Sequence, residues 1–260
     1  MSNNTSGATN NSRQCRILLL NPNTSQSMTE GLEQVAQRAA HHDTDVVPMT
    51  LTSGFPYISS RAEAQISGAL VLEAIAAHEQ EIDAVVIAAF GDPGLKAARE
   101  LFDLPIIGMA EAAMLTAIQL GERFSIVTFT PAMSRWYLDS VHECGLTGRF
   151  ASLRTPDNHD GNVTNVQSRQ RESLTTLVRQ CVQEDGADVV ILGGAPLAGL
   201  SAQLQPEVQA ILIDPIWCAI RQAEALVSTV PREAWQNRFR KPLPKTSLGL
   251  DVELARRMAK

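Results

Sequence analysis

Aromatic residues and positive charge are both scarce in this chain of 260 residues. Phenylalanine, tryptophan and tyrosine make up 5% of the sequence, and 28 aspartate and glutamate residues outnumber 22 lysine and arginine residues, giving a formal net charge of -6. Proteins that bind nucleic acid usually carry a basic patch for the phosphates or an aromatic platform for the bases. We therefore expect no nucleic-acid partner.

Long apolar runs are missing as well. A membrane-spanning helix needs about 20 consecutive apolar residues, and no run in this sequence approaches that length. The first 14 residues, MSNNTSGATNNSRQ, have neither the basic start nor the apolar core of a signal peptide. We predict that residues 1–14 form a disordered polar tail, and we expect no membrane partner.

Cysteine is also rare, and its spacing matches neither disulfide pairs nor a metal site. The four cysteines are Cys15, Cys144, Cys181 and Cys218. This usage predicts a reduced, cytoplasmic protein. A polar loop at 155–162 contains His159 between two aspartates, but the spacing fits no standard zinc pattern, so we expect a turn and no metal.

Strand and helix patterns alternate along the chain, which is typical of an α/β fold. Apolar runs predict strands at 17–20, 46–51, 84–89, 105–108, 124–129, 189–192 and 211–213. Helical spacing and capping residues predict helices that begin at Thr24 or Ser25, at 62–78, 94–102, 111–120, 134–144 and 168–184, and near the C-terminus.

The two halves of the chain repeat each other. The segment 83–95 matches the segment 188–200 without a gap, at an offset of 105 residues (188 minus 83). A repeat of this length predicts two pseudo-symmetric α/β lobes with parallel sheets. The predicted division is a first lobe at 15–120 plus 214–229, a second lobe at 121–213 and a C-terminal extension at 230–260.

We expect the functional site in the cleft between these lobes. Ligands of parallel α/β sheets bind beyond the carboxyl ends of the strands. Ala89 and Gly194 occupy matching positions at two strand ends and are expected to face each other. The loops expected to surround the cleft are 21–25, 88–94, 128–134 and 193–199.

Four motifs resemble the aspartate/glutamate/hydantoin racemase superfamily, with the hydantoin racemase branch closest. They are NPNTS at 21–25, FGDPGL at 90–95, GMAEAA at 108–113 and LGGAPLAG at 192–199. The resemblance covers roughly residues 15–228 and depends on the joint order and spacing of the motifs. It implies a two-lobed fold without a cofactor, acting on a small molecule by chemistry such as racemisation, isomerisation or decarboxylation.

The same resemblance shows what this chain lacks. Racemases of the superfamily carry one cysteine at each facing strand end, whereas this chain has Ala89 and Gly194 there. Neither residue can carry a proton, so the resemblance implies that two-thiol racemisation is lost. Our leading interpretation is a cofactor-independent hydrolase or lyase acting on a hydantoin-like, thiohydantoin-like or carboxylated molecule. The alternatives are a hydantoin or allantoin racemase with a non-standard base, and a non-catalytic protein that binds a small acid.

Three residues are candidates for catalysis. Asp92 either holds its turn through its carboxylate or acts as a general base. Glu111 either stabilises a helix start or faces the ligand. Cys218 follows a strand end near a helix start, a position that lowers a thiol pKa, although a buried structural thiol is the other interpretation.

Substrate binding is assigned to the polar and glycine-rich strand ends. The candidates are Asn21, Asn23, Thr24, Ser25, Ala89, Phe90, Gly91, Thr128, Thr130, Gly193, Gly194 and Ala195. The polar residues at 21–25 could also serve only as a helix cap. We further expect a homo-oligomer, and the extension at 230–260 is either a cap on its own subunit or an arm that crosses to a neighbour.

Overall fold

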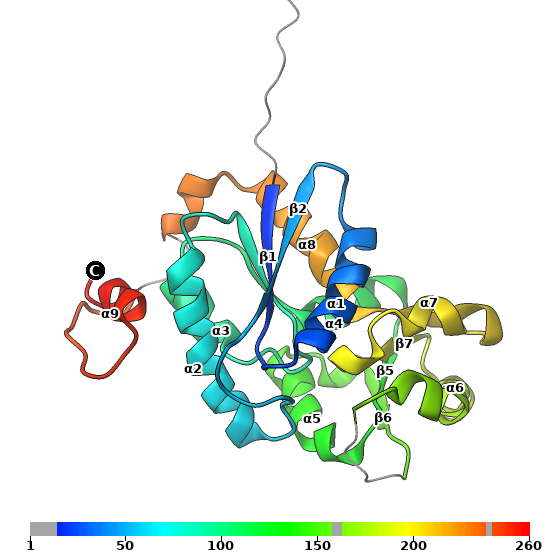
Figure 1. Cartoon of the computed structure of the whole chain (residues 1–260). Helices are drawn as coiled ribbons and strands as arrows, with labels where there is room; N and C mark the ends of the chain where they lie inside the picture. The colour runs from blue at the N-terminus through cyan, green and yellow to red at the C-terminus, as the bar shows by residue number, and fades with distance from the viewer. Residues whose placement is uncertain (1–14, 158–162, 238–240) are drawn as a thin grey trace, which may run out of the picture.

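The computed structural model describes residues 15–157, 163–237 and 241–260, which form two parallel sheets flanked by helices (Figure 1). The first sheet has the order β2-β1-β3-β4. Its strands are β1 (Cys15–Asn21), β2 (Thr44–Thr50), β3 (Ala84–Ile87) and β4 (Ile106–Gly108). The second sheet has the equivalent order β6-β5-β7-β8. Its strands are β5 (Phe124–Val127), β6 (Phe150–Arg154), β7 (Val189–Leu192) and β8 (Ile211–Ile213).

The first sheet is covered on both faces, which explains its continuous apolar strands. Its helices are α1 (Gln26–Ala39), α2 (Arg61–His78), α3 (Leu95–Leu101) and α8 (Pro215–Thr229), whereas α4 (Met109–Leu120) follows β4 and packs between α8 and β7 of the second sheet. Side chains of a strand alternate between faces, so Ile17 and Leu19 lie on the side of α1 and α8, whereas Leu18 and Leu20 lie on the side of α2 and α3.

The second lobe repeats this arrangement with further helices. They are α5 (Ser134–Glu143), α6 (Val166–Gln183) and α7 (Leu200–Leu204). Short 3-10 turns connect the elements: η1 (Pro131–Met133), η2 (Thr147–Arg149), η3 (Ala195–Leu197), η4 (Gln205–Glu207) and η5 (Arg232–Asn237). The predicted α/β fold with two parallel sheets is confirmed.

One strand escaped the prediction. The edge strand β6 is partly exposed along its whole length, FASLR. Because one side of an edge strand faces solvent, its sequence has no continuous apolar run of the kind that marks β3 and β7. Among the described residues, no helix combines the length and the apolar character needed to cross a membrane.

The C-terminal helix α9 (Val252–Met258) packs against α2 of its own chain, at the outer side of the first lobe (Figure 1). Leu254 is buried among the apolar side chains of α2 and α3. The Arg257 guanidinium donates to the Leu101 carbonyl at 2.7 Å and to the Asp103 carboxylate at 3.0 Å. The described end of the extension is therefore a cap on its own lobe, and the homo-oligomer stays a prediction.

Replacing Leu254 with alanine is expected to release α9 while leaving the rest of the lobe folded. Truncating a buried leucine removes about 2–5 kcal/mol of packing free energy, and a seven-residue helix has little stability of its own. Hydrogen exchange followed by mass spectrometry should show faster exchange in α9 and unchanged exchange in β1 and β3. The exposed neighbour variant Val252→Ala is the control, and equal protection of α9 in both variants would contradict the expectation.

Candidate functional site

Aromatic side chains fill the space between the two lobes, and we call this group the aromatic seam. Its members are Tyr57, Phe90, Phe129, Trp136 and Tyr137. Phe90, after β3, packs against Tyr137 of α5 with ring centroids 4.6 Å apart. Tyr57, after β2, packs against Phe129, after β5, at 6.0 Å. The seam therefore joins strand-end loops of both lobes.

The two glycines after β7 are packed directly against the seam. A Cβ atom at Gly193 would lie 3.3 Å from the Phe90 ring. At Gly194, a Cβ atom would lie 2.9 Å from Phe129 and 3.3 Å from the Tyr137 hydroxyl. Gly194 also has a φ of +121°, which side-chain-bearing residues rarely adopt. The structure thus gives a steric reason for glycine at position 194.

Two buried hydroxyl groups in this region have no hydrogen-bond partner among the described residues. They are Tyr57 Oη and Thr128 Oγ1. Burial, and secondarily the nearby Tyr57, raises the pKa of Tyr137 well above its usual range. Thr128 lies close enough to the Tyr137 hydroxyl to oppose this rise without reaching hydrogen-bond geometry. Because an unsatisfied buried hydroxyl is costly, these groups mark a place where a polar ligand would be stabilised.

The Asp92 carboxylate caps helix α4. One oxygen accepts the N–H of Ala110 and the other accepts the N–H of Glu111, each at 2.8 Å. The residue has a φ of +50°, a left-handed conformation that aspartate tolerates better than most side chains. Burial raises the pKa of Asp92 to about 7 even though both backbone hydrogen bonds act in the opposite direction. The predicted turn-holding role is thus present, together with a carboxylate that titrates near neutral pH.

In the second half of the sequence repeat, the helix that corresponds to α4 is α8, and the carboxylate that caps it comes from the residue just before the helix. Asp214 caps α8 by accepting the N–H of Ile216 at 3.0 Å, and its other oxygen accepts the N–H of Gly199, after β7, at 2.5 Å. The pairing of the strands places Asp214 at the position equivalent to Gly108. A Cβ atom at Gly108 would collide with the Asp92 carboxylate. With Asp92 present, position 108 therefore has no room for a side chain.

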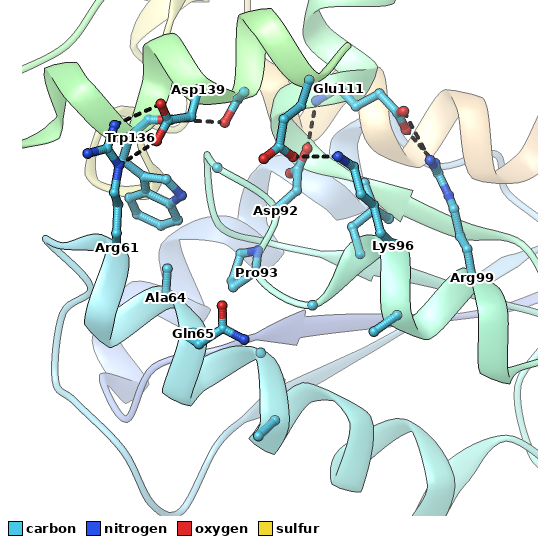
Figure 2. Close-up of a pocket in the computed structure, with 18 of the residues that line it drawn as sticks. Arg61, Ala64, Gln65, Asp92, Pro93, Lys96, Arg99, Glu111, Trp136 and Asp139 are labelled. Atoms are coloured by element: carbon cyan, nitrogen blue, oxygen red, sulfur yellow. Dashed lines mark hydrogen bonds and ion pairs between the residues drawn. The ribbon is translucent and has the colours of Figure 1, made fainter. Parts of the chain in front are cut away.

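Asp92 also lines a cavity of about 560 Å³ between α2 and α5, which we call the α2–α5 cavity (Figure 2). Glu111 lies on its wall, where it forms an ion pair with Arg99. At the rim, Arg61 of α2 donates to Asp139 of α5 at 2.8 Å, so this ion pair bridges the two lobes. The Glu111 carboxylate is thus paired with the Arg99 guanidinium.

A second bridge, between Lys96 and Glu143 at 2.9 Å, crosses from α3 to α5. The side chain of Lys96 is 72% exposed. Exposed ion pairs contribute little to stability, typically about 0–1 kcal/mol each. The bridges over the α2–α5 cavity can therefore open at small cost.

The polar loop after β1 uses most of its side chains internally. The Asn21 amide donates to Asn23 Oδ1 at 3.0 Å and to Thr29 Oγ1 at 2.9 Å. Asn23 Oδ1 also accepts the N–H of Ser25, and Ser25 Oγ caps α1. The backbone N–H of Thr24 donates to a carbonyl of the loop after β2. These bonds correspond to the helix-cap interpretation of the loop.

A cavity of about 730 Å³ opens between this loop and the second lobe, and we call it the α1–α6 cavity. Ser25 and Met28 line it from the first lobe, and Ala195 and Pro196 line it from the second. Strand-end loops of both lobes therefore meet here, as the sequence predicted for β1 and β7.

Cys218 matches the interpretation of a buried structural thiol. The alternative, a thiol pKa lowered by a helix start, is wrong, because burial raises the pKa to about 11. The side chain is buried in the apolar core formed by α4 and α8, and it lies near Thr116. Its thiol is therefore protonated near neutral pH. His159, in the loop for which we expected a turn and no metal, lies outside the described residues.

The structure distributes the predicted site residues over three places. The α2–α5 cavity is lined by Gly91, Asp92 and Glu111. The α1–α6 cavity is lined by Ser25 and Ala195. The buried region at the strand ends includes Asn21, Asn23, Ala89, Phe90, Thr128, Thr130, Gly193 and Gly194.

The sequence analysis did not identify Tyr57 and Tyr137 as candidate site residues, although they are the only two tyrosines of the chain. The loop after β2, which carries Tyr57, belongs to the same carboxyl edge as the four loops that were considered. Extending the strand-end rule to every strand of the sheet would have included it.

The geometry of two facing α/β lobes also matches known proteins. A profile described as Asp/Glu/Hydantoin racemase matches residues 17–223. The chain belongs to this family. It is 34% identical over 235 residues to the hydantoin racemase of Paenarthrobacter aurescens, covering 90% of this chain and 100% of the relative.

Solved structures of the family agree with this assignment. The allantoin racemase from Klebsiella pneumoniae is 33% identical with a TM-score of 0.80, covering 90% of this chain and 97% of that structure. The allantoin racemase from Pseudomonas fluorescens is 28% identical, also with a TM-score of 0.80, covering 90% and 100%. The relatives are named as racemases, so the comparisons favour the racemase alternative and give no support to hydrolysis or elimination.

Proposed function

We propose that this protein is an isomerase that exchanges the proton on the stereogenic carbon of a five-membered cyclic ureide, such as a 5-substituted hydantoin or allantoin. The proposal is supported by the similarity to hydantoin and allantoin racemases across 90% of the chain. It requires a base other than a thiol at the facing strand ends, because these positions hold Ala89 and Gly194.

The observation that carries the proposal is the partly buried Asp92 carboxylate after β3, which lines the α2–α5 cavity and whose pKa is raised to about 7 mainly by desolvation. A general base is most effective when its pKa lies near the working pH. By contrast, the thiols of Cys144 and Cys218 have pKa values raised to about 12 and about 11, so they are poor bases at neutral pH. Asp92 is therefore the proton acceptor in this proposal.

The buried hydroxyls of Tyr57 and Thr128 supply the hydrogen-bond donors that the reaction needs besides a base. Abstraction of the ring proton places negative charge on the neighbouring carbonyl oxygen, and preorganised donors stabilise such charge. Tyr57 and Thr128 have hydroxyls without protein partners, and the Asp92 charge contributes to raising the pKa of Tyr137, so the carboxylate and the seam are within electrostatic reach of each other. In the proposal, these hydroxyls bind the ring carbonyl while Asp92 accepts the ring proton and releases it to solvent. A proton from water then adds to the opposite face of the planar enolate, which restores the ring with inverted configuration.

A second candidate function is non-catalytic binding of a small cyclic acid or amide. It is favoured by one observation, namely that both Asp92 oxygens already accept backbone N–H groups of α4. A carboxylate used in this way would position the loop, and the unpartnered hydroxyls would bind a ligand without any proton transfer.

Solvent deuterium exchange distinguishes the two candidates. Single enantiomers of 5-substituted hydantoins and of allantoin would be incubated with the protein in D₂O and followed by mass spectrometry and chiral chromatography. The isomerase predicts deuterium at the stereogenic carbon with loss of optical purity, and a Tyr57→Phe variant should slow the exchange by about tenfold or more. Ligand binding measured by calorimetry without deuterium uptake would establish the binding protein instead.

A further inference from the structure

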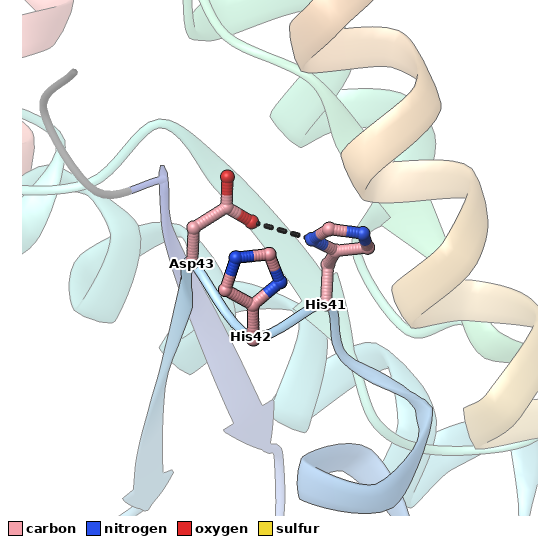
Figure 3. A group of neighbouring side chains, drawn as sticks. All are labelled: His41, His42 and Asp43. Atoms are coloured by element: carbon pink, nitrogen blue, oxygen red, sulfur yellow. Dashed lines mark hydrogen bonds and ion pairs between the residues drawn. The ribbon is translucent and has the colours of Figure 1, made fainter. Parts of the chain in front are cut away.

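A compact group of metal-binding side chains lies in the loop between α1 and β2. His41, His42 and Asp43 are consecutive and exposed, and each offers a ligand atom within 4.8 Å of the other two (Figure 3). His41 Nδ1 lies 2.8 Å from Asp43 Oδ1. The two imidazole rings are 4.5 Å apart between centroids. These side chains already converge on one point above the loop.

The backbone under this group is held in place by α8. One carboxylate oxygen of Glu224 accepts the N–H of His41 at 2.6 Å and the hydroxyl of Thr44 at 2.7 Å. The N–H of Thr44 donates to the His41 carbonyl at 3.0 Å, which closes the turn. Arg221 in turn holds the other oxygen of Glu224 at 3.1 Å. The loop is therefore preorganised, and ligand binding needs only side-chain rotation.

We propose that His41, His42 and Asp43 bind a divalent transition-metal ion of the zinc class. Metal–ligand bonds of about 2.0–2.2 Å place neighbouring ligand atoms roughly 3–3.5 Å apart, a spacing that the 2.8 Å His41–Asp43 contact already approaches. The remaining separation closes by rotation of exposed side chains, which are not confined by packing. Two imidazoles and one carboxylate favour zinc, nickel or copper over magnesium or calcium, which prefer oxygen ligands. Water completes the coordination.

The group lies at the opposite end of the first sheet from the candidate functional site. The loop leads into the amino end of β2, whereas the aromatic seam and both cavities lie beyond the carboxyl ends of the strands. The bound ion would therefore fix the connection between α1 and β2 and take no part in proton exchange. The inference does not depend on the proposed function.

Zinc binding to the full chain without a polyhistidine tag tests the site. Calorimetric titration with ZnCl₂ is expected to show one equivalent bound with a micromolar Kd, and the melting temperature should rise with zinc concentration because the ion binds the folded state. His41→Ala and His42→Ala should each weaken binding by roughly tenfold or more. The matched control is His142→Ala, an exposed histidine on α5, which should leave the affinity unchanged.

Circular dichroism of every variant would verify folding, which is expected to be intact because the substituted side chains are exposed. Zinc affinity that is the same in wild type, His41→Ala and His42→Ala would overturn the proposal, as would the lack of binding in the micromolar range. A Co²⁺ complex with visible d–d bands in wild type, lost in His42→Ala, would support it independently of the calorimetry.

Discussion

A cysteine at position 194 is expected to lower the free energy of unfolding by about 3 kcal/mol, whereas a cysteine at position 89 should change it by less than about 1 kcal/mol. Gly194 has a φ of +121°, and a side chain there is strained. Its Cβ would also lie 2.9 Å from Phe129, which must then move. Ala89 already carries a Cβ atom in a buried position without such a constraint.

Urea unfolding of Ala89→Cys, Gly194→Cys and the double variant would measure these differences. The Ala89→Cys variant is the matched control, because it adds the same thiol at the facing strand end. Equal stability of the two single variants would show that the loop after β7 adapts to a side chain and that the backbone conformation at Gly194 is not required. The expected result means that a thiol pair cannot be installed in this chain by substitution at these two positions alone.

Replacing Asp92 with asparagine is expected to remove proton exchange, by a factor of about 100 or more. In wild type the exchange rate should rise with pH and level off above pH 7, because the pKa of the Asp92 carboxyl is about 7 and only its ionised form accepts a proton. Asp139→Asn is the control, since Asp139 lines the same cavity as an exposed ion-pair partner of Arg61. Retained exchange in Asp92→Asn would exclude Asp92 as the base.

The free energy of unfolding of the wild-type protein should depend on pH in a way that the Asp92→Asn variant does not share. Burial raises the Asp92 pKa from 3.8 to about 7 on folding, so the folded state holds this proton more tightly than the unfolded state. The stabilisation is complete below pH 4 and is lost as the pH rises to 7. At about 1.36 kcal/mol per pKa unit, the loss is on the order of 4 kcal/mol, and it should be absent from Asp92→Asn. Urea unfolding at pH 4, 5.5 and 7 measures it, and a parallel pH dependence of both proteins would contradict it.

The fold was predictable where the sequence records burial on both faces. The runs at 84–89 and 189–192 predicted β3 and β7, and their offset of 105 residues predicted two similar lobes with parallel sheets, which the structure shows with matching strand orders. The edge strand β6 was not predictable in the same way, because partial exposure leaves a mixed sequence there. The apolar pattern thus identified the central strands and the edge strands β2, β4 and β8, and it missed β6, whose residues are all partly exposed.

The candidate site was predictable only as a set of loops. The carboxyl-edge rule indicated the end of each sheet where the aromatic seam and both cavities lie, but it could not tell that Phe90 packs against Tyr137. It also could not foresee that the buried Cys218 thiol has a raised pKa, because that pKa depends on packing between α4 and α8. Contacts between lobes come from residues far apart in the chain, and one sequence does not reveal them.

In each half of the sequence repeat, a carboxylate connects a strand-end loop to the start of a helix, and this contact limits how the two halves can diverge. The first half of the sequence repeat has its carboxylate at Asp92 and a glycine at position 108. The second half has its carboxylate at Asp214, which is equivalent to Gly108, and the buried Leu197 at the position equivalent to Asp92. An aspartate introduced at position 108 while Asp92 is present would put two carboxylates into one buried space, which disfavours ionisation of both. The acidic residue can therefore change sides only if both positions change together. Ancestral substitutions at this contact are expected in pairs, and residue-by-residue alignment of the two lobes will understate their common origin at this point.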